Sequence, residues 1–191
     1  MGVREESKIR TRQKIIDNTK MLLLHNGFVK VSTKEIASQS EVSQGSIFLH
    51  FGTKDNLLNT ILSSNIESLE LEVKEKCKPT DSQDLFLRNF LDVLIEYENI
   101  LSRVYKDYSY LSETLCKQID SYEAFVKNLF YENFKKKGVK RLSIVDSFIA
   151  IDAYNSQLKY YLLEKKVFSD TNSIIRQRRG RIVKLYKMLF E

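Results

Sequence analysis

The chain has very few residues that readily turn the backbone: one Pro and six Gly among 191 residues. A β-sandwich or a barrel needs many tight turns, and those turns use Gly and Pro. Long helices joined by a few connections need far fewer of them. Hydrophobic residues make up 42% of the chain, which is ordinary for a protein with a buried core. We therefore predict an all-α fold of about nine helices.

The N-terminal third shows the clearest helix boundaries. Apolar residues recur about every seven positions over residues 9–24, and Gly27 follows them as a helix-ending residue. Thr33 and Ser43 are predicted N-caps of two short helices, and Thr53 is the predicted N-cap of a fourth helix ending near residue 76. Later helices are predicted over residues 82–97 (capped by Asp81 or Ser82), 100–113, 117–137, 143–165 (capped by Ser143) and 171–190.

Two short capped helices separated by a tight turn, between two longer helices, are typical of a helix-turn-helix. The helix over residues 43–50 would enter the major groove of duplex DNA, and the helix over residues 33–39 would brace it. We therefore predict a three-helix DNA-binding domain over residues 1–55. Residues 56–191 are predicted to form a helical domain for effector binding and dimerisation.

The run from Gly27 to Leu58 closely resembles the DNA-binding domain of the TetR family of transcriptional regulators. The resemblance implies a dimeric DNA-binding regulator with a variable helical C-terminal part. Two positions depart from the family pattern, since Glu41 stands where Gly is frequent and Leu49 where an aromatic residue, often Tyr, contacts phosphate. The matching residues are Gly27, Phe28, Ser32, Thr33, Ile36, Ala37, Val42, Ser43, Gly45, Ile47, Phe48, His50, Phe51, Thr53, Lys54 and Leu57.

Several side chains of the helix-turn-helix are predicted to contact DNA. Gln44 is the predicted base reader, because a Gln amide forms two hydrogen bonds with an adenine edge. Lys54, at a helix N-terminus, is predicted to attract a phosphate, and Gly45 lets the backbone approach one. The resemblance places His50 at the protein–DNA boundary, where it braces the helix. The predicted DNA-binding residues are Thr33, Lys34, Ser43, Gln44, Gly45, Ser46, Phe48, His50 and Lys54.

Residues 86–168 hold nine Tyr and seven Phe, which is most of the aromatic residues of the chain. Apolar cavities between helices are the usual ligand sites of helical bundles. A small hydrophobic effector is therefore predicted to bind there, although each single aromatic residue is also compatible with a plain core. The predicted pocket residues are Phe86, Phe90, Tyr97, Tyr108, Tyr122, Phe125, Phe148, Tyr154 and Asn155.

The last two predicted helices carry apolar stripes that the resemblance assigns to a four-helix bundle between two subunits. The predicted homodimer interface consists of Ile144, Phe148, Ile151, Leu158, Ile175, Ile182, Leu185 and Leu189. The basic run of residues 177–181 is either solvated or meets an anionic group, and the sequence leaves both readings open.

The charges are unevenly distributed. Residues 1–62 hold nine Lys/Arg against six Asp/Glu, residues 63–134 eight against fourteen, and residues 135–191 fourteen against five. A basic N-terminal segment fits a polyanion such as DNA, and it is equally compatible with a solvated surface.

Other function classes find little support. The chain has two His and two Cys, with no metal-ligand spacing, no nucleophile motif and no Gly-rich phosphate loop, so we predict no enzyme, no metal and no cofactor. No stretch is apolar enough for a signal peptide or a membrane span, which favours a cytoplasmic protein. We predict a repressor of a palindromic operator that a small hydrophobic effector releases. The alternatives are a regulator controlled by a protein partner and a non-specific architectural DNA-binding protein.

Overall fold

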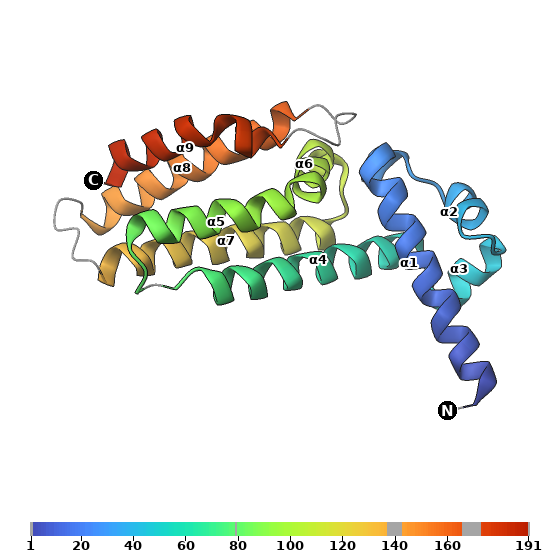
Figure 1. Cartoon of the computed structure of the whole chain (residues 1–191). Helices are drawn as coiled ribbons and strands as arrows, with labels where there is room; N and C mark the ends of the chain where they lie inside the picture. The colour runs from blue at the N-terminus through green and yellow to red at the C-terminus, as the bar shows by residue number, and fades with distance from the viewer. Residues whose placement is uncertain (1, 79, 137–142, 166–172, 191) are drawn as a thin grey trace.

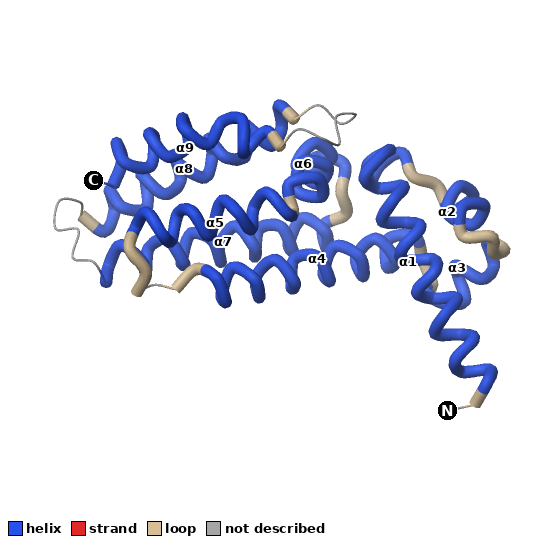
Figure 2. The backbone as a smooth tube through the Cα atoms, viewed as in Figure 1, coloured by secondary structure: helices blue, strands red, loops and turns tan. Residues whose placement is uncertain are grey.

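The computed structural model of the chain describes residues 2–78, 80–136, 143–165 and 173–190. Within these residues the chain forms helices and no strand, which confirms the predicted all-α fold (Figure 2). The helices are α1 (Val3–Lys30), α2 (Thr33–Gln39), α3 (Gln44–Phe51), α4 (Lys54–Lys76), α5 (Gln83–Glu96), α6 (Glu98–Asp107), the 3-10 helix η1 (Tyr108–Tyr110), α7 (Glu113–Lys136), α8 (Ile144–Glu164) and α9 (Ile174–Phe190).

The helices form a small head and a long body (Figure 1). The head consists of α1, α2 and α3, and the body consists of α4 to α9. Helix α1 lies between the body and the pair α2–α3, and its first turns project beyond α3. Helices α8 and α9 run side by side along one side of the body, and the two chain ends lie at opposite ends of the molecule.

Four of the predicted N-caps are confirmed. The side chains of Ser43, Thr53, Ser82 and Ser143 each accept a hydrogen bond from a backbone N–H three residues later. Each cap satisfies a backbone donor that the first turn of its helix would otherwise leave without a partner. These caps set the starts of α3, α4, α5 and α8.

The predicted cap at Thr33 is wrong by one residue. Ser32 is the N-cap of α2, and its hydroxyl oxygen accepts a hydrogen bond of 3.2 Å from the N–H of Glu35. The Glu35 carboxylate in turn accepts a hydrogen bond of 2.9 Å from the N–H of Ser32. This reciprocal pair is a capping box, which needs an acidic residue or Gln three positions after the cap. Ser32 has Glu35 at that distance, whereas Thr33 has Ile36.

Gly27 interrupts α1 where the sequence indicates a helix end. Its φ of 82° and ψ of 175° lie in a backbone region that is almost confined to Gly. The helix begins earlier than predicted, at Val3, and a last helical turn follows the break and reaches Lys30. This last turn directs Phe28 into the core, where its side chain is fully buried.

One continuous core runs from the head into the body along α4. In the head it contains Ile15, Leu23, Ile36 and Ile47, and the first turns of α4 add Leu57. The predicted boundary between residues 55 and 56 therefore falls inside a continuous helix that belongs to both parts. The division into two domains remains a prediction.

The centre of the body is aromatic. The ring of Phe130 on α7 packs edge-on against Phe86 and Phe90 of α5, with ring centroids 5.1 and 4.9 Å away. Tyr154 of α8 and Tyr186 of α9 complete the cluster around the same ring. Edge-to-face contacts of this kind stabilise a core beyond the area that they bury. This cluster fixes the positions of the four body helices that surround it.

Candidate DNA-binding interface and ligand pocket

Helix α3 has one buried side and one exposed side. Ile47 and Phe51, four residues apart, are buried against the head, whereas Gln44, Gly45 and Leu49 are exposed. A helix of eight residues that buries a single stripe leaves most of its surface free. The arrangement holds α3 at the surface of the head, as entry into a DNA groove requires.

The tight turn before α3 contains a residue in the left-handed region. Glu41 has a φ of 50°, which L-residues rarely adopt. The N–H of Val42 donates to the carbonyl of Ala37 at 3.0 Å and closes the turn. The Glu41 carboxylate accepts a hydrogen bond from Lys14 of α1 at 2.5 Å, and this contact lowers the pKa of Glu41. The turn therefore keeps its shape with Glu where the family often has Gly, at a cost in backbone strain.

The variants Glu41→Gly and Glu41→Ala separate that strain from the ion pair. Both variants lose the exposed contact with Lys14, and only Gly removes the strain of the positive φ. We expect the free energy of unfolding of Glu41→Gly to exceed that of Glu41→Ala by about 1 kcal/mol. Urea denaturation of both variants measures the difference. Equal stability would mean that Glu41 carries no backbone strain.

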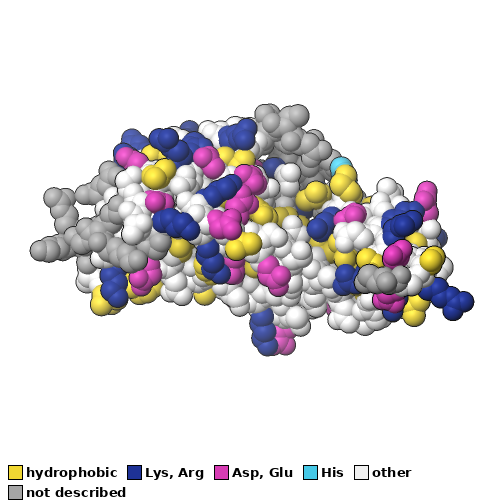
Figure 3. All heavy atoms as spheres, turned by 60° about the horizontal axis from the view of Figure 1, so that its bottom comes forward, with side chains coloured by type: hydrophobic (Ala, Val, Ile, Leu, Met, Phe, Trp, Pro, Cys, Tyr) yellow, Lys and Arg dark blue, Asp and Glu magenta, His cyan; other side chains and the backbone are white. Residues whose placement is uncertain are grey.

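Several cationic side chains lie on the elements next to α3. Lys34 is exposed at the start of α2, and Lys54 stands at the start of α4, where it contributes to the lowered pKa of Glu35 after the hydrogen bonds from Ser32. The Arg12 guanidinium lies 4.9 Å from the ring centroid of Phe51. The face in Figure 3 shows Lys, Arg, Asp, Glu and hydrophobic side chains intermingled over the head. Cations on the elements next to an uncharged helix suit contacts with the phosphates beside a groove.

The environment of His50 identifies a cation that the sequence analysis did not single out. Burial lowers the pKa of His50, and the neighbouring charges of Lys8 and Arg12 lower it further. Lys8 thus lies close to the end of α3. The signal was available, because Lys8 and Arg12 are four residues apart and share one face of α1.

The predicted DNA-binding residues all reach the surface, in α2, in α3 and the turn before it, and at the start of α4. Lys34, Ser43, Gln44, Gly45 and Phe48 are exposed. The other four predicted residues are partly exposed: Thr33, Ser46, His50 and Lys54. The Ser43 and Ser46 hydroxyls lie 3.0 Å apart and share a hydrogen bond, so each hydroxyl already has a protein partner.

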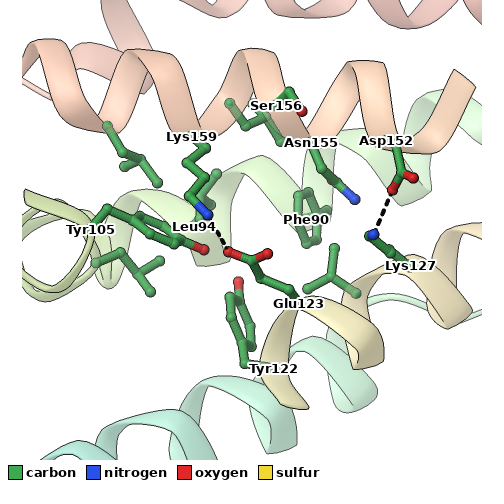
Figure 4. Close-up of a pocket in the computed structure, with 14 residues that line it drawn as sticks. Phe90, Leu94, Tyr105, Tyr122, Glu123, Lys127, Asp152, Asn155, Ser156 and Lys159 are labelled. Carbon is green, nitrogen blue, oxygen red and sulfur yellow. Dashed lines mark hydrogen bonds and ion pairs between the residues drawn. The ribbon is translucent and has the colours of Figure 1, made fainter. Parts of the chain in front are cut away.

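A cavity of about 330 Å³ lies in the body between α5, α6, α7 and α8 (Figure 4). This volume is at the lower end of the range for small-molecule sites. Of the predicted pocket residues, Phe90, Tyr122 and Asn155 line it. Its other lining residues include Leu94, Leu101, Tyr105, Glu123, Val126, Lys127, Asp152, Ser156, Leu158, Lys159 and Leu162.

Two ion pairs cross this cavity from α7 to α8. Lys159 donates a hydrogen bond of 2.7 Å to Glu123, and Lys127 lies 2.7 Å from Asp152. The Lys159 ammonium also lies 4.6 Å from the ring centroid of Tyr105. Burial raises the pKa of Tyr105, with Tyr122 and Glu123 adding to the rise, so its phenol stays neutral. The cavity is therefore aromatic and apolar with a paired polar seam.

Six of the nine predicted pocket residues do not line this cavity. Phe86 and Tyr154 are fully buried in the aromatic cluster around Phe130. Phe148 stacks on Tyr131, and Phe125 lies under the ammonium of Lys74. Tyr97 joins α5 to α6 and lies outside the cavity lining. Tyr108 also lies outside it and donates a hydrogen bond to Asp120. Most of the predicted aromatic residues pack in the core or against other side chains and do not line the cavity. Aromatic content alone therefore did not locate the cavity.

The polar seam of the cavity was missed by the sequence analysis. Glu123 and Lys127 are four residues apart on α7, and Asp152 and Lys159 are seven residues apart on α8, which is about two turns. Charged residues at helical spacing on the inner side of two apolar helices are the signal that would have found them.

The predicted dimer interface needs a partial correction. Ile151, Leu158, Ile175 and Ile182 are buried inside the single subunit, with at most 5% of each side chain exposed. Leu185 and Leu189 are half-buried, while Ile144 and Phe148 remain exposed. The long apolar stripes of α8 and α9 therefore mainly pack the two helices onto their own subunit.

Helix α8 carries a second apolar stripe on its exposed side. This stripe consists of Val145, Ile149, Tyr160 and Leu163. On α9, Met188 is also apolar and exposed. The first and last members are 18 residues apart, which is about five helical turns. Asp152 and Ser156 lie between the two apolar ends of this stripe on the same side of the helix. Exposed apolar residues at both ends of one helix side suit an association face.

Helix α6 connects the cavity to the head. Leu101 and Tyr105 line the cavity, and Asp107 accepts hydrogen bonds from the N–H groups of Phe28 and Val29 at 2.6 and 3.3 Å. The Arg103 Nε donates to the carbonyl of Leu24 at 2.6 Å. One helix of ten residues thus lines the cavity with some residues and holds the end of α1 with others.

None of the described helices combines the length and the hydropathy of a membrane span. The described residues contain no group of His, Cys, Asp and Glu side chains arranged to hold a metal ion.

A surface helix behind a tight turn, surrounded by cations and joined to a helical body, defines a DNA-binding regulator of the helix-turn-helix class. Residues 15–61 match the sequence model of the bacterial regulatory proteins of the tetR family. Over its DNA-binding part the chain matches the TetR family, whose members are DNA-binding regulators and not enzymes.

The comparisons with individual proteins agree with this assignment. The chain is 29% identical over 132 residues to the HTH-type transcriptional regulator QacR of Staphylococcus aureus, covering 65% of this chain and 69% of that protein. It is 27% identical over 90 residues to the fatty acid metabolism regulator protein of Bacillus subtilis, covering 45% and 46% of the two chains.

Solved structures show the same fold over most of the chain. The TetR family regulator PfmR of Thermus thermophilus superimposes with a TM-score of 0.68 at 16% identity, covering 91% of this chain and 97% of that one. The fatty acid degradation regulator FadR of Bacillus halodurans gives a TM-score of 0.71 at 13% identity, covering 94% of each chain.

Proposed function

We propose that this transcriptional regulator is a homodimeric repressor of a palindromic operator, and that a small hydrophobic effector releases it from DNA. The observation that carries this proposal is the position of α6. Its Leu101 and Tyr105 line the cavity, while its Asp107 and Arg103 hold the end of α1. A ligand that repacks the cavity wall would therefore act on the helix that anchors the head.

The proposed DNA interface consists of the exposed side of α3 and the cations around it. Gln44 would read an adenine edge, and Lys34 and Lys54 would contact phosphates on opposite sides of the groove. Thr33, Ser43 and Ser46 would add phosphate or base contacts, and Gly45 would let the backbone approach the DNA. His50 would brace the end of α3 as a neutral imidazole beside Phe51.

The proposed dimer uses the exposed stripe of α8 together with the exposed side of α9. A two-fold axis along this stripe would pair Val145, Ile149, Tyr160 and Leu163 with their copies and cover their apolar surface. Ile144 and Phe148 extend the same end of α8. The two α3 helices of the dimer would have to lie about 34 Å apart to read successive turns of one DNA face.

The proposed release works by a shift between two arrangements of the head. Effector binding would move α6, and the hydrogen bonds that Asp107 accepts and Arg103 donates would carry this movement to α1. Helix α4 gives a second route, because it is continuous from the head into the body. A coupling of about 1–3 kcal/mol would suffice for a substantial release. The effector would be an apolar molecule with one polar group for the seam formed by Glu123 and Lys159.

One experiment in two stages tests the proposal. Selection of bound duplexes from a random pool at low salt should enrich a palindrome, and a panel of hydrophobic compounds should then include one that releases it. A pool without enrichment would favour a non-specific architectural protein. Release by no compound, together with no ligand-induced rise in melting temperature, would favour control by a protein partner.

The variants Gln44→Ala and Lys54→Ala separate base reading from phosphate contact. Gln44→Ala should change the sequence that the selection enriches, because it removes an adenine contact. Lys54→Ala should weaken binding to all duplexes alike and reduce the salt dependence by about one phosphate contact. Titrations at several salt concentrations measure both effects. An unchanged preference in Gln44→Ala would remove Gln44 from the reading surface.

A further inference from the structure

The outermost residue of α3 is apolar. Successive residues of an α-helix are rotated by about 100°, so Leu49 points almost directly away from the buried pair Ile47 and Phe51. Its side chain is 77% exposed, and Phe48 beside it is 47% exposed. Gly45, one turn earlier on the same side, has no side chain to cover Leu49. Leu49 therefore points away from the head on the helix that the proposed function places in the major groove.

The polar groups of α3 read few base edges. Its sequence, QGSIFLHF, contains no Lys, Arg, Asn, Asp or Glu. Guanine is most often read by Arg or Lys and cytosine by Glu or Asp, whereas Gln suits adenine. The Ser46 hydroxyl is shared with Ser43, and His50 is partly buried. The remaining base feature in the major groove that an apolar side chain recognises is the C5-methyl group of thymine.

We propose that Leu49, supported by Phe48, reads the thymine C5-methyl group and makes A·T pairs the directly read positions of each half-site. This inference rests on the proposed DNA-binding function. The occupant is duplex DNA because cations lie on the neighbouring elements, with Lys34 and Lys54 at the starts of α2 and α4 and Arg12 beside Phe51. A purely hydrophobic partner would leave these positive charges without an opposite charge.

The test removes the methyl group from the DNA and the side chain from the protein. Each thymine of the selected half-site is replaced in turn by deoxyuridine, which lacks only the C5-methyl group. Fluorescence anisotropy then gives the dissociation constants for the full-length protein and for Leu49→Ala. For the unaltered protein we expect deoxyuridine at one or two of these thymine positions to weaken the affinity for DNA by about threefold to tenfold. For Leu49→Ala we expect equal binding of thymine and uracil at those same positions.

A matched variant controls for general effects of losing an exposed leucine. Leu71 on α4 is 58% exposed, and Leu71→Ala should keep the full uracil penalty. Circular dichroism checks that Leu49→Ala is folded, which its exposure favours. Leu49→Tyr is a second variant that should gain affinity for all duplexes through phosphate and lose the uracil penalty.

Each outcome has a definite meaning. A specific duplex bound with no uracil penalty at any thymine, or with the same penalty in Leu49→Ala, would overturn the thymine reading and leave the proposed function intact. Enriched half-sites without A·T pairs would overturn it as well. A pool from which nothing is enriched would overturn the proposed function together with this inference.

Discussion

Gly27→Ala is expected to lower the free energy of unfolding by about 3 kcal/mol. Gly27 has a φ of 82° and a ψ of 175°, a conformation that strains any residue with a Cβ atom. A Cβ atom at this position would lie 2.5 Å from Oδ2 of Asp107. The same oxygen accepts the hydrogen bonds of Phe28 and Val29, so the clash would also loosen the attachment of α1 to α6.

Gly180→Ala provides the matched control for this prediction. Gly180 lies in the middle of α9, and a Cβ atom added there meets nothing within 4 Å. Ala is the better helix former, so this variant should be more stable by about 0.5–1 kcal/mol. Chemical denaturation of both variants gives the two changes. If Gly27→Ala lost no more stability than Gly180→Ala, the proposed tight anchoring of α1 on α6 would be wrong.

Ile149→Glu should separate the proposed dimer and weaken operator binding by about 100-fold. Ile149 is 62% exposed in the single subunit and lies within the apolar stripe of α8. A two-fold axis near this residue would bring two carboxylates together in an apolar contact, which is strongly unfavourable. A separated subunit offers one reading helix and loses the gain in affinity from holding two half-sites at once.

Sedimentation velocity and operator titration measure the two effects on the same samples. Leu71→Glu is the control, because Leu71 is 58% exposed on α4 and lies outside the stripe. The control variant should remain dimeric and bind the operator with unchanged affinity. A dimeric Ile149→Glu variant with full affinity would place the association face elsewhere.

The local structure of the head was largely predictable because it depends on residues close together in the sequence. Ser43 and Thr53 cap their helices through hydrogen bonds to residues three positions later. Even the one-residue error at Thr33 was local, since it came from overlooking Glu35 as the partner of Ser32 in the capping box. The turn at Glu41 depends partly on Lys14, which is 27 residues away and was not foreseen.

The cavity was only partly predictable because four helices build it. Phe90, Tyr122 and Asn155 were expected to line it, and they do. Phe86 and Tyr154 were expected there as well, but they pack around Phe130. An aromatic residue at helical spacing faces inward in either case, so its spacing cannot tell a core position from a cavity wall.

The apolar residues of α8 illustrate the same limit. Ile151 and Ile149 are two residues apart and equally apolar, yet the first is fully buried and the second is 62% exposed. A helix with apolar residues on two sides gives no local sign of which side meets its own subunit.

By itself, the sequence determined the helical class, most helix starts and the helix-turn-helix, because caps and turns act over a few residues. The tertiary structure decided which aromatic residues surround the cavity, which stripe of α8 stays exposed and how α6 holds α1. Those features depend on contacts between side chains far apart in the sequence, such as Asp107 with Phe28 or Lys159 with Glu123. These features depend on how whole helices pack against one another, and a short stretch of sequence does not contain that information.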